Sequence, residues 1–185
     1  MIRLALDLEM NEGDKQSIIQ VGACIFNTET SEILDTFDQI VFQNECITPF
    51  IIKLTGITQK KVNEGRPLIN VYRDLVDFST RHNCRVFPIV TWGSGDLKLL
   101  KRQVAEYHSW KLGRTEMDVK SIYQAYCDAN NLDLQGGLKG ATNKMGLIFD
   151  GPAHNALKDS VATAKLYCRL LDILRIKECL VGKID

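Results

Sequence analysis

The chain has 185 residues, of which 45% are hydrophobic and 25% charged, a composition typical of one globular domain. Its 23 basic and 23 acidic residues cancel, which argues against a broad basic surface for gripping nucleic acid but leaves room for a local basic rim. The six cysteines lack zinc-binding spacing, and the sequence shows neither a signal peptide nor an apolar run long enough to cross a bilayer. We therefore expect a single domain, residues 1–185, of a cytoplasmic protein with no membrane partner.

The opening ten residues, MIRLALDLEM, alternate apolar and other side chains, which is the pattern of a β-strand. Asp7 and Glu9 therefore share one face of this strand, about 7 Å apart along it. Neighbouring carboxylates repel each other and are costly to bury unless a cation lies between them, so this pair is a candidate metal site. An edge strand with one solvated face explains the same two residues equally well when this stretch is taken alone.

Two more segments rich in β-branched residues, 17–27 and 33–43, follow across short polar turns, so an antiparallel meander is expected. A buried strand is expected at 84–92, where Pro88 places it toward a sheet edge or a bulge. The expected helices cover 58–62 after a Thr58 cap, 67–83, 96–107 (through Tyr107), 116–131, 138–146 and the stretch from Pro152 to about Ile176. This order predicts an α/β domain in which a mixed central sheet, the meander plus parallel strands, is flanked by helices.

The last predicted helix carries an acid on its buried side. At 100° per residue, Asp159 projects onto the stripe that contains Leu166 and Leu170. A carboxylate at the head of a buried stripe needs a partner. His154 precedes the helix, on the loop that holds Pro152, where its imidazole can lie beside Asp159 and remain open to solvent.

A fourth acid, Asp96, follows a Gly-Ser-Gly corner after the predicted strand 84–92 and stands at the start of a helix. A role as a helix cap explains Asp96 without any chemistry. A lone histidine is likewise usually a surface or core residue. Each of these residues is weak evidence for a functional site when taken singly. Their order along the chain is the stronger evidence.

That order, DLE on a first strand, Asp96 after a later strand and His-x4-Asp at the head of the last helix, resembles the DEDD superfamily of 3′–5′ exonucleases. The histidine is typical of its DEDDh subgroup, and the resemblance implies a ribonuclease H-like fold. The segments 53–62, 92–100 and 138–164 are most similar to the enhanced-RNAi type, the group that includes histone-mRNA 3′-end exonucleases. The opening DLEM is closer to oligoribonuclease, and Lys158 stands where the enhanced-RNAi type usually has an acid.

The resemblance implies that four carboxylates, those of Asp7, Glu9, Asp96 and Asp159, hold two Mg²⁺ or Mn²⁺ ions. Glu9 would also touch the ion that carries the attacking water, and His154 would be the general base. An imidazole, with an unperturbed pKa of about 6.5, suits proton removal at neutral pH. The expected partner is the 3′ end of a single-stranded nucleic acid, RNA favoured over DNA, and the expected products are nucleoside 5′-monophosphates.

By the same resemblance the substrate is expected to touch Met10, Leu54, Thr55, Gly56 and Ile57, and Trp92 to stack on a base, although a tryptophan at a strand end is more often core. A phosphate-binding rim is considered for Lys98, Lys101, Arg102, Lys139 and Lys144, although a solvated helix face is the better account of any one of them taken singly. The alternatives are an oligoribonuclease-like enzyme, a DNA proofreading or repair exonuclease, and a catalytically inactive nucleic-acid-binding module.

Overall fold

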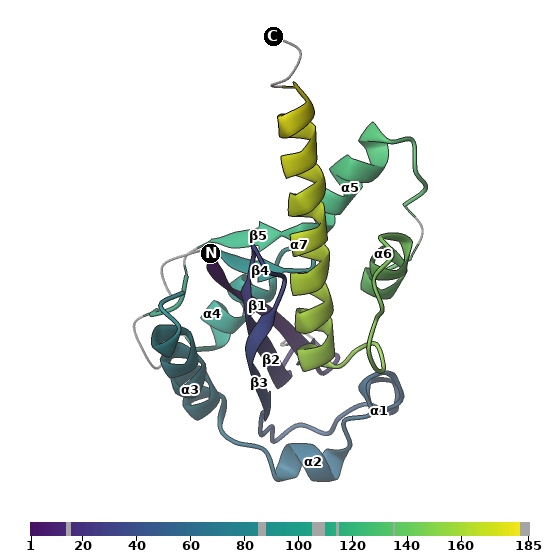
Figure 1. The fold of residues 1–185 in the computed structure, drawn as a ribbon. Coiled ribbons are helices and arrows are strands. Elements are labelled where there is room, and N and C mark those ends of the chain that lie inside the picture. The colour runs from purple at the N-terminus through teal and green to yellow at the C-terminus, as the bar shows by residue number, and fades with distance from the viewer. Residues whose placement is uncertain (14–15, 85–87, 105–109, 114, 135, 182–185) are drawn as a thin grey trace.

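The computed structural model describes residues 1–13, 16–84, 88–104, 110–113, 115–134 and 136–181, with side chains through residue 175. Within this part of the chain five strands form one mixed sheet in the order β3-β2-β1-β4-β5 (Figure 1). The strands are β1 (Ile2–Met10), β2 (Ile18–Asn27), β3 (Ile33–Ile40), β4 (Ile89–Thr91) and β5 (Glu116–Asp118). The helices are α1 (Pro49–Thr55), α2 (Gln59–Asn63), α3 (Leu68–Arg81), α4 (Asp96–Val104), α5 (Val119–Ala129), α6 (Leu138–Lys144) and α7 (Ala156–Val181).

The three N-terminal strands form the expected antiparallel meander, and β4 and β5 extend it in parallel. β1 lies inside the sheet, between β2 and β4, so the explanation of Asp7 and Glu9 as residues of an edge strand is wrong. Of the two positions expected for the strand that holds Pro88, an edge or a bulge, the edge position is also wrong. β4 pairs with β1 and with β5, and Pro88 lies just before its first residue, where a missing N–H costs no ladder hydrogen bond.

Both faces of the sheet are buried under helices. Leu4 and Leu6 of β1 lie in an apolar cluster with side chains of α3 and α4. Ala5 lies in a second cluster, on the opposite face, with side chains of α5, α6 and α7. Because strand residues alternate between faces, Asp7 and Glu9 lie on the face of Ala5, the one that α7 covers. Among the described helices, none combines the length and the apolar run that a bilayer crossing needs.

The helix predicted over 116–131 is wrong at its start. Residues 116–118 form strand β5, which pairs in parallel with β4, and helix α5 begins at Val119. Asp118 lies at the boundary, where its side chain accepts a hydrogen bond from the backbone N–H of Ser121 at 3.3 Å and caps the helix. A strand of three residues is too short to show a periodicity in the sequence.

Helix α1 is a further element that the sequence patterns missed. Thr48 caps it by accepting the backbone N–H of Ile51 at 3.3 Å, and Pro49 is its first residue. With seven residues it shows less than two turns of periodicity. Residues 85–87 of the predicted fourth strand and Tyr107 of the helix predicted after it lie outside the described residues.

Helix α7 lies directly on β2 at Gly22. A Cβ atom at this position would lie 2.1 Å from backbone atoms of Ala156 and Leu157. Gly22 is also the strand partner of Asp7. The missing side chain therefore allows the first turn of α7 to lie against the sheet beside that carboxylate.

Gly22→Ala is expected to lower the free energy of unfolding by about 3 kcal/mol or more, because the added methyl group overlaps backbone atoms that cannot rotate away. Urea unfolding measures this loss. Gly137→Ala is the control, since its Cβ would meet nothing within 4 Å and its φ is −70°. The control should lose less than about 1 kcal/mol. Equal losses in the two variants would contradict the close approach of α7.

Candidate functional site

Four carboxylates from three parts of the chain lie close enough to act on one another. Asp7 and Glu9 lie near the end of β1, Asp96 is the first residue of α4, and Asp159 lies in the first turn of α7. β1 and β4 are parallel, so their carboxyl ends lie at the same edge of the sheet, where α4 follows β4. Burial raises the pKa of Asp7 well above its ordinary value, and the charges of Asp96 and Asp159 raise it further.

The other three acids also have raised pKa values, and burial is the largest cause in each. Burial raises the pKa of Glu9 to about 8, with a further contribution from Asp159 and Asp96. Burial raises the pKa of Asp96 to about 7, with help from the charge of Glu116. Burial also raises the pKa of Asp159, although His154 acts in the opposite direction. The site therefore concentrates negative charge that a divalent cation would neutralise.

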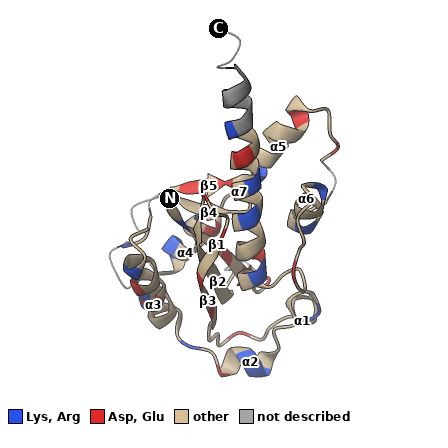
Figure 2. Cartoon of the chain, in the orientation of Figure 1, with Lys and Arg blue, Asp and Glu red and all other residues tan. Residues whose placement is uncertain are grey.

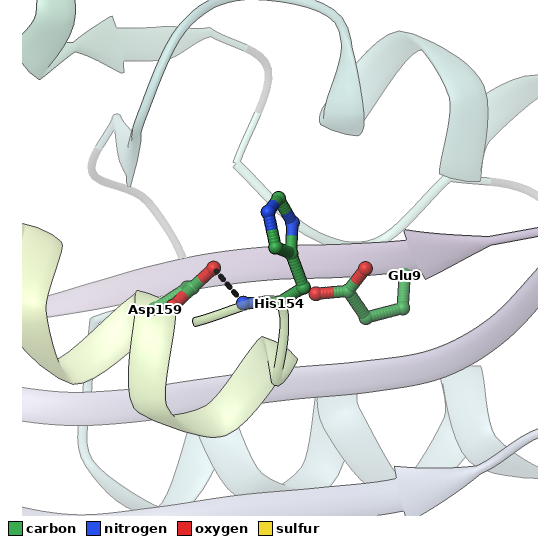
Figure 3. Close-up of side chains that lie close together, drawn as sticks. All are labelled: Glu9, His154 and Asp159. Carbon is green, nitrogen blue, oxygen red and sulfur yellow. Dashed lines mark hydrogen bonds between the residues drawn. The ribbon is translucent and has the colours of Figure 1, made fainter. Parts of the chain in front are cut away.

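Glu9, His154 and Asp159 form a tight group (Figure 3), in which one potential ligand atom of each residue lies within 4.8 Å of the others. As predicted, His154 is exposed on the loop before α7 and lies beside Asp159. Its φ of 61° is in the left-handed region, which is unfavourable for a residue other than glycine. Its backbone N–H donates to Oδ2 of Asp159 at 3.2 Å, and this hydrogen bond helps to hold the loop in that conformation.

The two carboxylate oxygens of Asp159 differ in their hydrogen bonding. Oδ2 accepts the N–H of His154, whereas Oδ1 is buried and has no hydrogen-bond partner among the described residues. A buried carboxylate oxygen without a partner is costly. Carboxylate oxygens are the ligands that Mg²⁺ and Mn²⁺ prefer, so this unpaired oxygen and its acidic neighbours fit a divalent cation.

Glu9→Gln is expected to reduce the pH dependence of the stability of the metal-free protein. In the native state Glu9 keeps its proton up to a pKa of about 8, whereas the unfolded chain loses it near 4.5. The free energy of unfolding should therefore fall as the pH rises through this window. The loss is on the order of a few kcal/mol, or several degrees in Tm. Thermal unfolding with a chelator present checks this, and equal slopes in both proteins would contradict it.

The corner that presents Asp96 is held by β5. Oε1 of Glu116 accepts the backbone N–H of Leu97 at 2.8 Å, and Oε2 accepts that of Gly95 at 3.3 Å. Gly95 has a φ of 130°, a conformation that other residues rarely adopt. The capping role considered for Asp96 therefore belongs to Glu116. The sequence patterns missed Glu116 because they assigned it to a helix.

Segment 54–57, expected to contact substrate, is the end of α1 and the turn after it. Gly56 caps the helix with a φ of 71° and is exposed. The Thr55 hydroxyl accepts the backbone N–H of Ile57 at 3.0 Å, which fixes the turn. Ile57 is only 3% exposed and lies in an apolar cluster against which Leu54 packs. These two side chains support the turn from the core, and Gly56 is the part most open to a ligand.

Met10 and Trp92 lie half-buried at the ends of neighbouring strands. Met10 is the last residue of β1 and packs against the cluster beneath α3 and α4. Trp92 follows β4, and its ring centroid lies 6.1 Å from that of Tyr123. Because β1 and β4 are parallel, both residues lie at the carboxyl edge that also holds Asp7 and Asp96. The packing of Trp92 accounts for its presence, and base stacking stays a prediction.

Basic residues are distributed over several helices, including α2, α6 and α7 (Figure 2). Of those considered for a rim, Lys98, Lys101 and Arg102 lie on α4, and Lys139 and Lys144 on α6. Lys101 lies over the ring of Trp110 at 6.0 Å and Lys139 over that of Phe149 at 5.9 Å. Contacts within the protein therefore account for part of this set.

Two residues of β2 also shape the site and were missed by sequence reasoning. Gly22 admits the first turn of α7, and the side chain of Gln20 accepts the backbone N–H of Ala156 in that turn at 3.1 Å. A glycine inside an otherwise apolar strand is a signal of close backbone approach. The role of Gln20 has no such local signal.

Comparison with known proteins agrees with this geometry. The exonuclease family of the RNase T type matches residues 4–167. Mouse 3′-5′ exoribonuclease 1 is 25% identical over 176 residues, which cover 89% of this chain and 50% of that protein. The probable 3′-5′ exonuclease KapD of Bacillus subtilis is 29% identical over 153 residues, 81% of this chain and 71% of that protein. The chain thus spans about half the length of the mouse relative.

Solved structures show the same fold. The nuclease domain of 3′hExo, a DEDDh family member bound to rAMP, matches with a TM-score of 0.75 and 25% identity over 92% of each chain. Cell-death related nuclease 4 matches with a TM-score of 0.81 at 18% identity, over 93% of this chain and 64% of that one. Fold and site together define a ribonuclease H-like nuclease domain of the DEDDh type. The chain belongs to the exonuclease family, and its resemblance to the enhanced-RNAi group is confirmed.

Proposed function

We propose that this chain is a 3′–5′ exonuclease that uses two Mg²⁺ or Mn²⁺ ions to hydrolyse single-stranded nucleic acid, RNA in preference to DNA, to nucleoside 5′-monophosphates. We also propose that residues 1–185 are one exonuclease domain. The observation that carries the proposal is the hydrogen bonding of the two carboxylate oxygens of Asp159. One of its oxygens is held by His154, the other is buried without a partner in the described part of the chain, and Glu9 completes the group.

In the proposed mechanism Asp7, Glu9, Asp96 and Asp159 would hold the cations. Bound there, the cations would stabilise the charge that develops on the attacking and leaving oxygens of an in-line displacement at phosphorus. Glu9 orients the attacking water, and the imidazole of His154 takes its proton. Because His154 is exposed, it can pass that proton on to solvent.

The 3′-terminal nucleotide is proposed to lie between the end of β1 and the turn 54–57. The backbone N–H of Met10 meets the 3′-hydroxyl, and the turn contacts the base and sugar, with Gly56 as its exposed part. Trp92 stacks on a base. The preference for RNA is supported by the 3′hExo nuclease domain, whose solved structure holds rAMP, and by the mouse exoribonuclease.

The test is incubation of labelled RNA and DNA oligomers of one sequence with Mg²⁺. RNA should shorten stepwise from its 3′ end with release of nucleoside 5′-monophosphates, and DNA should shorten more slowly. The same RNA with a blocked 3′ end is the matched control and should stay intact. Faster loss of DNA would assign the chain to proofreading or repair, and cleavage confined to very short oligomers would assign it to the oligoribonuclease type.

A thermal titration with Mn²⁺ distinguishes the enzyme from an inactive binding module. A ligand that binds only the native state at 100 times its Kd adds about 2.7 kcal/mol of stability. We therefore expect Tm to rise with Mn²⁺ concentration. A flat response together with intact RNA would exclude the proposed enzyme.

A further inference from the structure

The start of α7 is fastened to the sheet by the side chain of Gln20. Gln20 lies on β2, is 2% exposed and is the strand partner of Glu9. Its Oε1 accepts the backbone N–H of Ala156, the first residue of α7, at 3.1 Å. The first N–H groups of a helix have no partner within the helix. Gln20 thus satisfies a buried donor that lies 136 residues further along the chain.

Asp38 decides which way the amide of Gln20 points. Oδ1 of Asp38 accepts a hydrogen bond from Nε2 of Gln20 at 2.7 Å. An ionised carboxylate only accepts hydrogen bonds, so the NH₂ group must face Asp38 and the amide oxygen must face Ala156. Asp38 lies on β3 as the strand partner of Gly22, the residue on which the same turn of α7 rests. Two adjacent strands, β2 and β3, therefore contribute residues that position the start of α7.

We propose that Gln20 and Asp38 are a positioning pair, which sets the separation between Glu9 and the residues of the α7 start. Ala156 lies two residues after His154 and three before Asp159, so fixing its N–H leaves both little freedom. His154 and Asp159 share a hydrogen bond, so they move with Ala156 as one unit. The pair acts through α7 and touches neither substrate nor cation. This inference rests on the proposed function, for which the separation matters.

At position 20, opposite Asp38, the amide of glutamine is better suited than the carboxylate of a glutamate. At the start of α4 the equivalent hydrogen bond, from Leu97, goes to Glu116, whose charge raises the pKa of Asp96. A carboxylate at position 20 would accept the N–H of Ala156 equally well. It would also face Asp38 at hydrogen-bond distance, where the two carboxylates repel each other. Gln20 supplies the hydrogen bond without the charge.

Three variants test the pair. Gln20→Met removes the acceptor at similar length and should lower kcat by about 10- to 100-fold, the usual effect of losing a group that orients metal ligands. Gln20→Glu should lose a similar factor, because two carboxylates then face each other. In Gln20→Glu combined with Asp38→Asn, the asparagine amide donates to the glutamate. This reversed hydrogen bond should restore kcat to within about threefold of the wild type.

The Mn²⁺ concentration that gives half of the rise in Tm is a second readout, independent of turnover. It should increase about tenfold in Gln20→Met and recover in the double variant. The control is Gln39→Glu, the same chemical change at the residue of β3 that follows Asp38, whose side chain lies on the opposite face of the sheet. It should change neither kcat nor the Mn²⁺ concentration at half of the rise in Tm.

Loss in Gln20→Glu with recovery in the double variant supports the positioning pair. A wild-type kcat and Mn²⁺ response in Gln20→Met, or a double variant no better than Gln20→Glu, overturns it. If the wild type binds Mn²⁺ but cuts no nucleic acid, the proposed function fails, and the Mn²⁺ response of the variants still decides the role of the pair. If Gln20→Met does not fold, Asp38→Ala at its exposed position should weaken the Mn²⁺ response, and an unchanged response would overturn the inference.

Discussion

Asp7→Asn is expected to lower exonuclease activity by about 10³-fold or more, and at the same time to raise the Tm of the metal-free protein. The charges of Asp96, Asp159 and Glu9 all act on Asp7. Asp7 is thus the acid on which the other three charges act together, and we expect its loss to weaken cation binding most. Burial and these charges raise the pKa of Asp7 well above its ordinary value, so a neutral amide is less costly at this place than a carboxylate.

The two opposite effects make this variant informative. Activity is measured with labelled RNA at saturating Mg²⁺, and Tm is measured with a chelator present. Asp7→Ala removes the side chain beyond Cβ, whereas Asp7→Asn keeps its shape. Both variants should show the same loss of activity. Asp77→Asn, on the exposed side of α3, is the matched control and should change neither quantity. A variant that keeps a tenth of the wild-type activity, or that melts lower than the metal-free wild type, would contradict the role given to Asp7.

The elements that carry the site were predictable because their patterns are local. The alternation in β1 placed Asp7 and Glu9 on one face, and β1 lies where both faces are covered. The stripe on α7 placed Asp159 in line with Leu166 and Leu170, which are 0% and 2% exposed. A strand of nine residues and a helix of 26 residues repeat their period often enough to be read from sequence alone.

The contacts that hold these elements together were not predictable, because they join distant parts of the chain. Glu116 reaches a residue 19 positions before it, and Gln20 reaches one 136 positions after it. Neither contact leaves a local pattern. Strand β5 with three residues was also hidden, and with it the role of Glu116. Only Gly22, a glycine within an apolar strand, gave a local signal of the close approach of α7.

Asp96 and Asp159, the two acids on helices, are positioned in the same way. Asp96 and Asp159 each lie in the first turn of a helix, and a side chain from a sheet strand accepts a backbone N–H of that turn. The helix starts are therefore fixed relative to the sheet, and the carboxylates are held together despite their repulsion. Raised pKa values are the cost of this arrangement, and a bound cation would relieve it. A site of this kind should be more stable with metal than without it.

His154→Ala is expected to lower kcat by about 10²- to 10⁴-fold, the range for loss of a general base, while the rise of Tm with Mn²⁺ persists. The backbone N–H that holds Asp159 is still present in alanine, so the cation ligands should keep their places. The φ of 61° costs alanine about 1 kcal/mol, which adds a small loss of Tm unrelated to the chemistry. His154→Asn separates the two effects, because asparagine tolerates this conformation but cannot act as the base. The two variants should share a low kcat and differ in Tm. Near-normal turnover in either at neutral pH would remove His154 from the base role, and loss of the Mn²⁺ response would make it a cation ligand instead.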